Sequence, residues 1–232
     1  MDHLDGVLST VVPLLKRVDE VLSTTGAPRD HEVWPELRRV RLLPWDAVQA
    51  VAALRPGELA GAASALRADA RSYAGVAASL PPPGPWSGEA AEAYDGARRR
   101  AAEHLSGGLD SLDERLEATA DLADALTDWM RRTRAELAAT LADVMVSAEA
   151  LALSESGPLP GGRHADPVVV GQAGTAGPAA AGEARTVGPG AIGEARAAAD
   201  VAARVLGSVA DSYDAALELV AGSADLTTAR RL

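Results

Sequence analysis

Apolar side chains recur at helical spacing along most of this chain. In the first 24 residues the steps between them alternate between four and three, and the apolar positions are Leu4, Leu8, Val11, Leu15, Val18 and Leu22. This spacing puts them on one face of a helix. Pro13 lies within the pattern and has no backbone N–H to donate, so we expect a kink or a restart there. We interpret residues 1–45 as an N-terminal helical extension.

A second helical region follows, and proline and glycine set its limits. Asp46 and Gln49 have the spacing of a capping box, which predicts a helix start at Asp46. Pro56 and Gly57 interrupt this helix, and a longer one is expected over residues 58–80. Its inner face is predicted to consist of Leu59, Ala62, Leu66, Tyr73, Val76 and Leu80, with Asp69 or Ala70 at the missing step. Four prolines between positions 81 and 85 end the helix.

The longest periodic segment spans residues 105–151. Steps of three and four residues continue through it, and one of its two columns is entirely apolar: Leu109, Leu116, Ala123, Met130, Leu137, Val144 and Leu151. A seam of this length is typical of coiled-coil-like packing. Gly107 and Gly108 interrupt it near its start, where the helix is expected to kink or to split into two arms. Trp129 lies beside the seam in line with Leu122, and either packs within the chain or anchors a partner helix.

The composition changes in the last third of the chain. Glycine and proline account for 15 of the 40 positions in residues 154–193, which we interpret as a flexible linker. Residues 194–232 are predicted to form a C-terminal helix, with a stripe made of Ala198, Ala202, Val205, Val209, Ser212, Ala216 and Leu219. Such a stripe must be buried, either against the rest of this chain or against another chain.

The amino-acid composition supports an all-helical fold. Alanine accounts for 51 of the 232 residues, aromatic residues number only seven, and alanine and leucine lead the helix-propensity scale. The predicted fold class is therefore all-α: an elongated antiparallel helical hairpin or helical bundle, with a flexible Gly/Pro-rich linker and a C-terminal helix. The absence of cysteine excludes disulfides, cysteine-ligated metal centres and thiol nucleophiles.

Charge and hydropathy narrow the range of partners. The formal net charge is −11 and no segment of the chain is basic, so binding to nucleic acid or to anionic membranes is disfavoured. No apolar run approaches the ~18 residues that cross a bilayer, so we expect no membrane insertion. The apolar residues near the N-terminus follow Asp2 and Asp5 and precede Lys16, which is the reverse of the charge order in a Sec signal peptide.

A turn motif separates the two helices of the central segment. The sequence Pro-Trp-Ser-Gly-Glu-Ala-Ala-Glu-Ala-Tyr at positions 85–94 contains Trp86 and Gly88, with Ser87 as a predicted N-cap and an Ala-rich helix start after it. This motif, with the helical patterns on both sides, resembles the Trp-x-Gly (WXG) family of type VII, or ESX, secretion. The resemblance covers residues 46–153 and implies a helical hairpin with Trp86 and Gly88 at the turn.

The resemblance also implies a function. We expect a non-enzymatic protein of a type VII secretion system that is secreted through this pathway as a substrate, or that acts as the helical partner of one. Its partners would be a second helical hairpin, in a homo- or hetero-dimer, and the secretion machinery. The residues expected to bind the partner are Leu109, Leu116, Trp129, Met130 and Leu137. The family's export signal, Tyr-x-x-x-Asp/Glu after the second helix, is missing from this chain.

Two other functions are compatible with the sequence. The first is a cytoplasmic helical scaffold or chaperone that is not itself secreted, which the missing export signal favours. The second is an enzyme, but the four histidines are scattered, and the acidic run in residues 110–128 is typical of a solvated helix face rather than of paired catalytic carboxylates. We therefore expect no catalytic residues, no metal site and no cofactor.

Overall fold

The computed structural model describes residues 3–155 and 189–229, and every regular element in this part of the chain is a helix. The helices are α1 (His3–Thr24), α2 (Val33–Val40), α3 (Pro44–Ala52), α4 (Pro56–Ser79), α5 (Glu89–Leu105), α6 (Leu112–Met145), α7 (Ala148–Glu155) and α8 (Pro189–Ala229). The predicted all-α fold class is confirmed. Most of the predicted linker, residues 154–193, lies outside the described residues.

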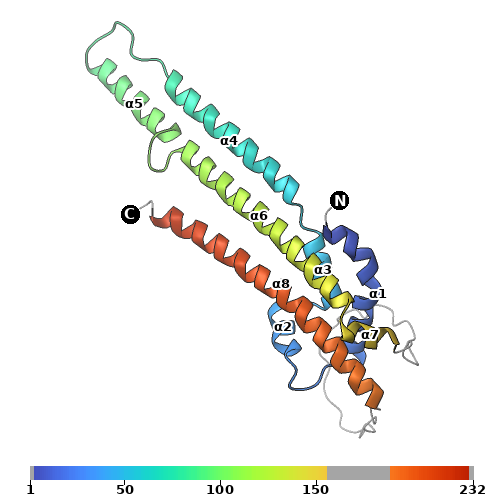
Figure 1. Cartoon of the computed structure of the whole chain (residues 1–232). Helices are drawn as coiled ribbons and strands as arrows, with labels where there is room; N and C mark the ends of the chain where they lie inside the picture. The colour runs from blue at the N-terminus through green and yellow to red at the C-terminus, as the bar shows by residue number, and fades with distance from the viewer. Residues whose placement is uncertain (1–2, 156–188, 230–232) are drawn as a thin grey trace, which may run out of the picture.

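Figure 1 shows an elongated molecule in which most helices gather at one end. α4 and α6 run side by side in opposite directions, and the chain reverses between α4 and α5 at the other end. α8 runs antiparallel to α6 along its C-terminal half, and α1, α2, α3 and α7 pack around this pair. We call this crowded end the base. The opposite end, formed by the last turns of α4, the turn and α5, is called the apex.

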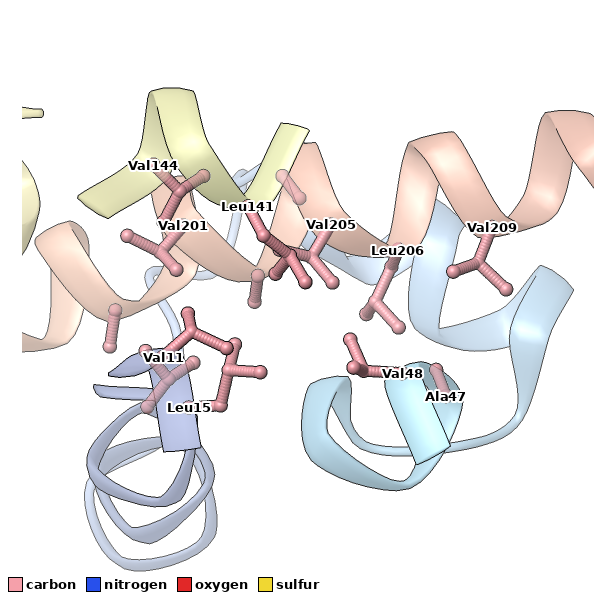
Figure 2. Packing of buried hydrophobic residues seen from close by; sticks show 14 of the residues in the cluster. Val11, Leu15, Ala47, Val48, Leu141, Val144, Val201, Val205, Leu206 and Val209 are labelled. Atoms are coloured by element: carbon pink, nitrogen blue, oxygen red, sulfur yellow. The ribbon is translucent and has the colours of Figure 1, made fainter. Parts of the chain in front are cut away.

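The core of the base is built mainly from valine and leucine side chains of α1, α2, α3, α6, α7 and α8, and α8 also contributes buried alanines such as Ala198 and Ala202. Figure 2 shows side chains from four of these helices gathered in this core: Val11, Leu15, Ala47, Val48, Leu141, Val144, Val201, Val205, Leu206 and Val209. Leu15, Leu141 and Val205 are fully shielded from solvent. Because burying one such side chain contributes about 1.5–3 kcal/mol, this cluster is the main source of hydrophobic stabilisation.

A buried arginine connects the base to the start of α4. Arg134 of α6 donates hydrogen bonds to the carbonyl oxygens of Ala52 at 2.6 Å, Val51 at 3.3 Å and Leu54 at 3.4 Å. Its Nη2 also donates to Asp5 Oδ1 at 2.9 Å. The last carbonyl groups of a helix have no partner within that helix, so the guanidinium caps the C-terminal end of α3. This contact fixes the segment that leads into α4.

α4 packs against α6 mainly through alanine. Ala63 of α4 and Ala120 and Ala123 of α6 are buried, and Leu59 and Leu66 are partly buried beside them. Alanine side chains allow two helices to approach closely, but each one removes little apolar area from water. α4 and α6 are therefore held together with much less hydrophobic burial than the helices of the base.

The start of α3 differs from the prediction. α3 begins at Pro44, and its N-terminus has no side-chain cap of its own, so the capping box of Asp46 and Gln49 is wrong. Proline is favoured in the first turn because it has no N–H to leave unpaired. A carboxylate from another helix takes part instead, since Asp19 Oδ1 of α1 accepts the Trp45 N–H at 3.4 Å.

The two terminal helices are longer or more continuous than predicted. α1 continues through Pro13 as one helix, so of the kink or restart expected there, the restart is wrong. α8 begins at Pro189, before the predicted start at residue 194, and extends to Ala229. α8 packs against α6, α1, α2 and α7. Its apolar stripe was expected to be buried either against the rest of this chain or against another chain. The structure shows burial against this chain.

The long periodic segment is not a single helix. α5 ends at Leu105 and α6 begins at Leu112. Between them Gly107 has a φ of 87°, and a Cβ added to Gly108 would lie 2.7 Å from the carbonyl oxygen of Glu103. A second bend, of 59°, separates α6 from α7. Of the kink and the split that were expected at Gly107 and Gly108, the structure shows the split into two arms. The apolar seam therefore does not run along one helix, because a spacing rule ignores the backbone conformation at glycine.

Candidate functional site

The chain reverses at the apex through the predicted turn motif. Gly88 has φ 100° and ψ −176°, a conformation that is open essentially only to glycine. Gly88 is also the N-cap of α5, so the predicted N-cap at Ser87 is wrong by one position. The carbonyl oxygen of Gly88 accepts the N–H groups of Ala91 at 3.0 Å and Glu92 at 3.2 Å, which starts the helix without a side-chain cap.

Trp86 packs against Tyr94 at this turn. Their ring centroids are 5.7 Å apart and the ring planes are inclined by 50°. The Tyr94 hydroxyl donates to the carbonyl oxygen of Pro81 at 2.9 Å, which ties α5 to the segment that follows α4. Trp86 nevertheless remains 48% exposed. A half-exposed indole on a fixed turn is a suitable anchor for another protein, because tryptophan contributes a large apolar area with few rotatable bonds.

The C-terminal half of α4 exposes the larger apolar residues that were predicted to face inward. Tyr73 and Val76 are exposed, whereas Ala70 in the same half is buried. The predicted inner face is therefore wrong for Tyr73 and Val76, and of the two residues considered for its missing step, Ala70 is buried and Asp69 is exposed. Alanine is the better residue for the buried stripe because it permits a close approach to α5 and α6. We call four exposed side chains of this end the apical apolar residues: Tyr73, Val76, Trp86 and Tyr94.

The residues predicted on the seam to bind a partner lie in different environments. Leu109 lies in the loop between α5 and α6 and is 81% exposed. Leu116 and Met130 are partly buried on α6. Leu137 is buried in the core of the base, so it is not accessible in this structure. The break at the start of α6 and the packing of α8 explain why these residues do not form one continuous face.

Trp129, the fifth predicted partner-binding residue, is buried within the chain. Its side chain is only 8% exposed, and its Nε1 donates to the carbonyl oxygen of Ser212 at 2.7 Å. Trp129 therefore anchors α8 on α6. Of the two interpretations considered for this residue, packing within the chain is the one that the structure shows.

The acidic run of α6 is partly neutralised by one arginine of α4. Arg67 Nη1 donates to Asp124 at 2.6 Å and Nη2 donates to Asp121 at 2.7 Å, while Nε lies 3.5 Å from Glu117. The hydrogen bonds to the two aspartates raise the pKa of the Arg67 guanidinium. All three carboxylates are solvent-accessible, as expected of a solvated helix face. These pairs also help to hold the alanine-based contact between α4 and α6.

A buried histidine, which was not singled out in the sequence, links α2 to α8. His31 Nε2 lies 3.0 Å from Asp200 Oδ1, and His31 Nδ1 accepts the Val33 N–H at 3.1 Å. Both ring nitrogens therefore have structural partners. No local pattern in the sequence identifies this role, because Asp200 is on a distant part of the chain.

Sequence reasoning also missed an exposed apolar surface near the end of α8. Leu217 is 69% exposed and Val220 is 49% exposed. The predicted stripe of α8 was correct for the buried residues Ala198, Ala202, Val205 and Val209. Periodicity identifies the apolar positions of a helix, but it does not show how far along the helix other elements cover them.

The described residues contain little else that suggests a chemical site. Among them, no single helix is long and apolar enough to cross a membrane, and α6 with α7 passes that test only as a bent pair. Within residues 3–155 and 189–229, no group of three or more His, Asp or Glu side chains is placed to hold a metal ion.

The fold thus defines an all-α protein whose candidate sites are exposed apolar helix surfaces. No protein-family model matches the sequence, and comparisons with curated proteins and with solved structures give no match.

Proposed function

We propose that this chain is a non-enzymatic WXG-like protein of a type VII secretion system. It acts through helix–helix binding, either as an exported substrate or as the helical partner of one. In this proposal α4, the turn, and α5 with α6 form the helical hairpin. The antiparallel course of α4 and α6, the chain reversal at residues 86–88 and the Ala-rich start of α5 support it.

The observation that carries the proposal is the distribution of apolar side chains at the apex. α4 faces α6 with alanine, while the apical apolar residues remain exposed. A pair of helices with one apolar face buried and another exposed is half of a four-helix bundle. A second hairpin would bury the exposed side chains, among which tryptophan and tyrosine are typical interface anchors. We infer a homo- or hetero-dimer with another helical hairpin protein.

The secretion machinery would then bind the surface formed by two hairpins together. The chain lacks a Tyr-x-x-x-Asp/Glu motif. Export would therefore depend on the pair rather than on a motif within this chain alone.

A cytoplasmic helical scaffold or chaperone is the second candidate function. Two observations favour it. The export motif is missing from the sequence. In addition, α8 covers the C-terminal half of α6 through contacts such as that of Trp129 with Ser212, which leaves less of α6 for a partner hairpin.

The test of export is the distribution of the protein between culture filtrate and lysate of its own host, with and without the type VII ATPase. Protein that is found in the filtrate and disappears without the ATPase supports an exported substrate. Protein that stays in the lysate of both strains contradicts export and favours a partner or scaffold inside the cell.

A variant at the turn tests whether the apex is the binding surface. Trp86→Ala is expected to reduce export, or co-purification with the partner hairpin, by about tenfold or more because a central anchor is lost. The matched control is Trp34→Ala, which removes an exposed tryptophan from α2, outside the hairpin. Equal behaviour of the two variants would contradict the role of the apex.

A further inference from the structure

α2 shows how a short amphipathic helix binds to α8. Its apolar residues Leu37 and Val40 pack against the core to which α8 contributes. Arg39, in its last turn, places Nη2 3.1 Å from Asp211 Oδ1 and 2.7 Å from Asp214 Oδ2 of α8. Hydrogen bonds to these two carboxylates raise the pKa of the Arg39 guanidinium above its ordinary value. α2 thus combines an apolar contact with a flanking cation.

The same combination continues along α8 beyond α2, where Leu217 and Val220 are left uncovered by the helices that the structure describes. Leu217 and Val220 are exposed, and Glu218 between them has no ion-pair partner among the residues that the structure describes. No arginine or lysine occurs in the sequence from Asp211 to Ser223. We call Leu217, Glu218 and Val220 the distal α8 surface, which is both apolar and negatively charged.

We propose that the distal α8 surface binds an amphipathic helix of a partner protein whose apolar stripe is flanked by arginine or lysine. The apolar residues of that helix would cover Leu217 and Val220. Its cation would bind Glu218, as Arg39 binds Asp214 one turn earlier on α8. Opposite charges at the edge of an apolar contact favour the correct partner and orientation.

A second copy of this chain does not fit this surface as well. Two distal α8 surfaces facing each other would place carboxylates against carboxylates, which disfavours the pair. The proposal also uses no residue of the α4–α6 hairpin. It can therefore fail or succeed independently of the proposed secretion function.

The experiment uses the full chain and two synthetic helical peptides of ~18 residues, about five helical turns. Both peptides carry leucine at helical spacing, and their flanking positions are arginine in one and glutamate in the other. Fluorescence anisotropy is expected to show binding of the arginine peptide only, with an affinity that falls as the salt concentration rises. Failure of the arginine peptide to bind, or equal binding of both peptides, would overturn the proposal.

Variants locate the binding surface. Glu218→Lys and the double variant Leu217→Ser/Val220→Ser are each expected to weaken binding of the arginine peptide by about tenfold or more. The matched control, Val146→Ser/Leu151→Ser, removes two exposed apolar residues at and after the end of α6 and should leave the affinity unchanged. Because all these side chains are exposed, the thermal melting curves of the variants should match that of the parent protein.

Three results of these measurements would contradict the proposal. The first is a control variant that weakens binding as much as the α8 variants do, and the second is a set of α8 variants that leave binding unchanged. The third would come from sedimentation velocity on the chain alone. If the chain forms a dimer and Leu217→Ser/Val220→Ser dissociates it, the surface binds a second copy of this chain instead.

Discussion

The base and the apex consist of the same kind of helix, but different side chains hold them together. In the base, valine and leucine from six helices meet in one core, and residues such as Leu141 and Val205 are fully shielded. Outside the base, α4 and α6 meet through alanine, and at the apex Tyr73 and Trp86 remain exposed. A buried leucine removes far more apolar area from water than a buried alanine. Helical spacing is therefore common to both regions, whereas side-chain size decides how strongly their helices are held together.

The largest effect on stability is expected in the core of the base. Leu141→Ala removes most of a fully shielded side chain and leaves a cavity, so the free energy of unfolding should fall by about 3 kcal/mol. Val76→Ala in the apex changes an exposed residue and should cost less than about 0.5 kcal/mol. Urea unfolding followed by circular dichroism measures both values. Equal losses would contradict the difference between the two regions.

A smaller effect is expected where the two regions join. Arg134→Met keeps much of the side-chain volume but removes the hydrogen bonds to Asp5 and to Ala52 O, which is then left with its longer bond from Arg55 Nη1 at 3.0 Å. The free energy of unfolding should fall by about 2 kcal/mol in urea unfolding. Arg131→Met is the matched control, since it breaks only an exposed pair with Asp128 and should cost less than about 0.5 kcal/mol. An equal loss in the free energy of unfolding for Arg131→Met would contradict the special role of Arg134.

A still smaller effect should remain within the apex. Gly88→Ala puts a side chain at φ 100°, which strains the turn by about 1–2 kcal/mol. Hydrogen–deuterium exchange should become faster in α5 and stay unchanged in α1. Gly61→Ala is the control, because a Cβ there meets no atom within 4 Å and alanine favours a helix over glycine. Faster exchange in the base of the Gly88 variant would show that the regions are more strongly coupled than we expect.

The smallest expected effect is a gain in stability rather than a loss, and it depends on pH. Burial raises the pKa of Asp19 to about 6, Asp46 adds to this shift, and the hydrogen bond from the Trp45 N–H opposes it. The folded-state pKa lies above the ordinary value of 3.8, so ionisation of Asp19 costs stability. The contribution of Asp19 to the free energy of unfolding should therefore fall as the pH rises from about 4 to about 6.

Asp19→Asn tests this prediction, because asparagine keeps an acceptor for Trp45 but cannot ionise. Above the folded-state pKa of about 6 the variant should be more stable than the parent. The gain should be less than about 1 kcal/mol, because solvent screens this half-buried group. The difference should disappear near pH 4. Urea unfolding at several pH values measures it, and a difference that grows as the pH falls would contradict the assignment.

The inward faces of the base could be predicted because their apolar residues are large and regularly spaced. Leu4, Val11, Leu15 and Val18 of α1 are buried, as their spacing predicts. The same spacing rule was misleading in α4, where two adjacent stripes are both apolar. Tyr73 and Val76 are larger than Ala63 and Ala70, but close packing against α6 selects the small residues for the interior.

The candidate site was predictable only in part, for physical reasons. Trp86 and Gly88 lie at the turn because proline ends one helix and glycine permits the reversal. Trp129 and Leu137 were predicted to bind a partner, yet they are buried within the chain. Their burial depends on where α8 packs, and no local pattern contains this information. The capping role of Arg134 has the same origin, since its acceptors are carbonyl groups on α3.

The interruption between α5 and α6 has a mechanical consequence. An unbroken helix acts as a stiff rod that transmits bending and twisting along its whole length. Here the rod is divided into a 17-residue α5 and a 34-residue α6, with glycine at the junction. A force applied at Trp86 therefore meets two different connections to the base: the unbroken 24-residue α4, and the jointed course of α5 and α6, which can bend at its glycines.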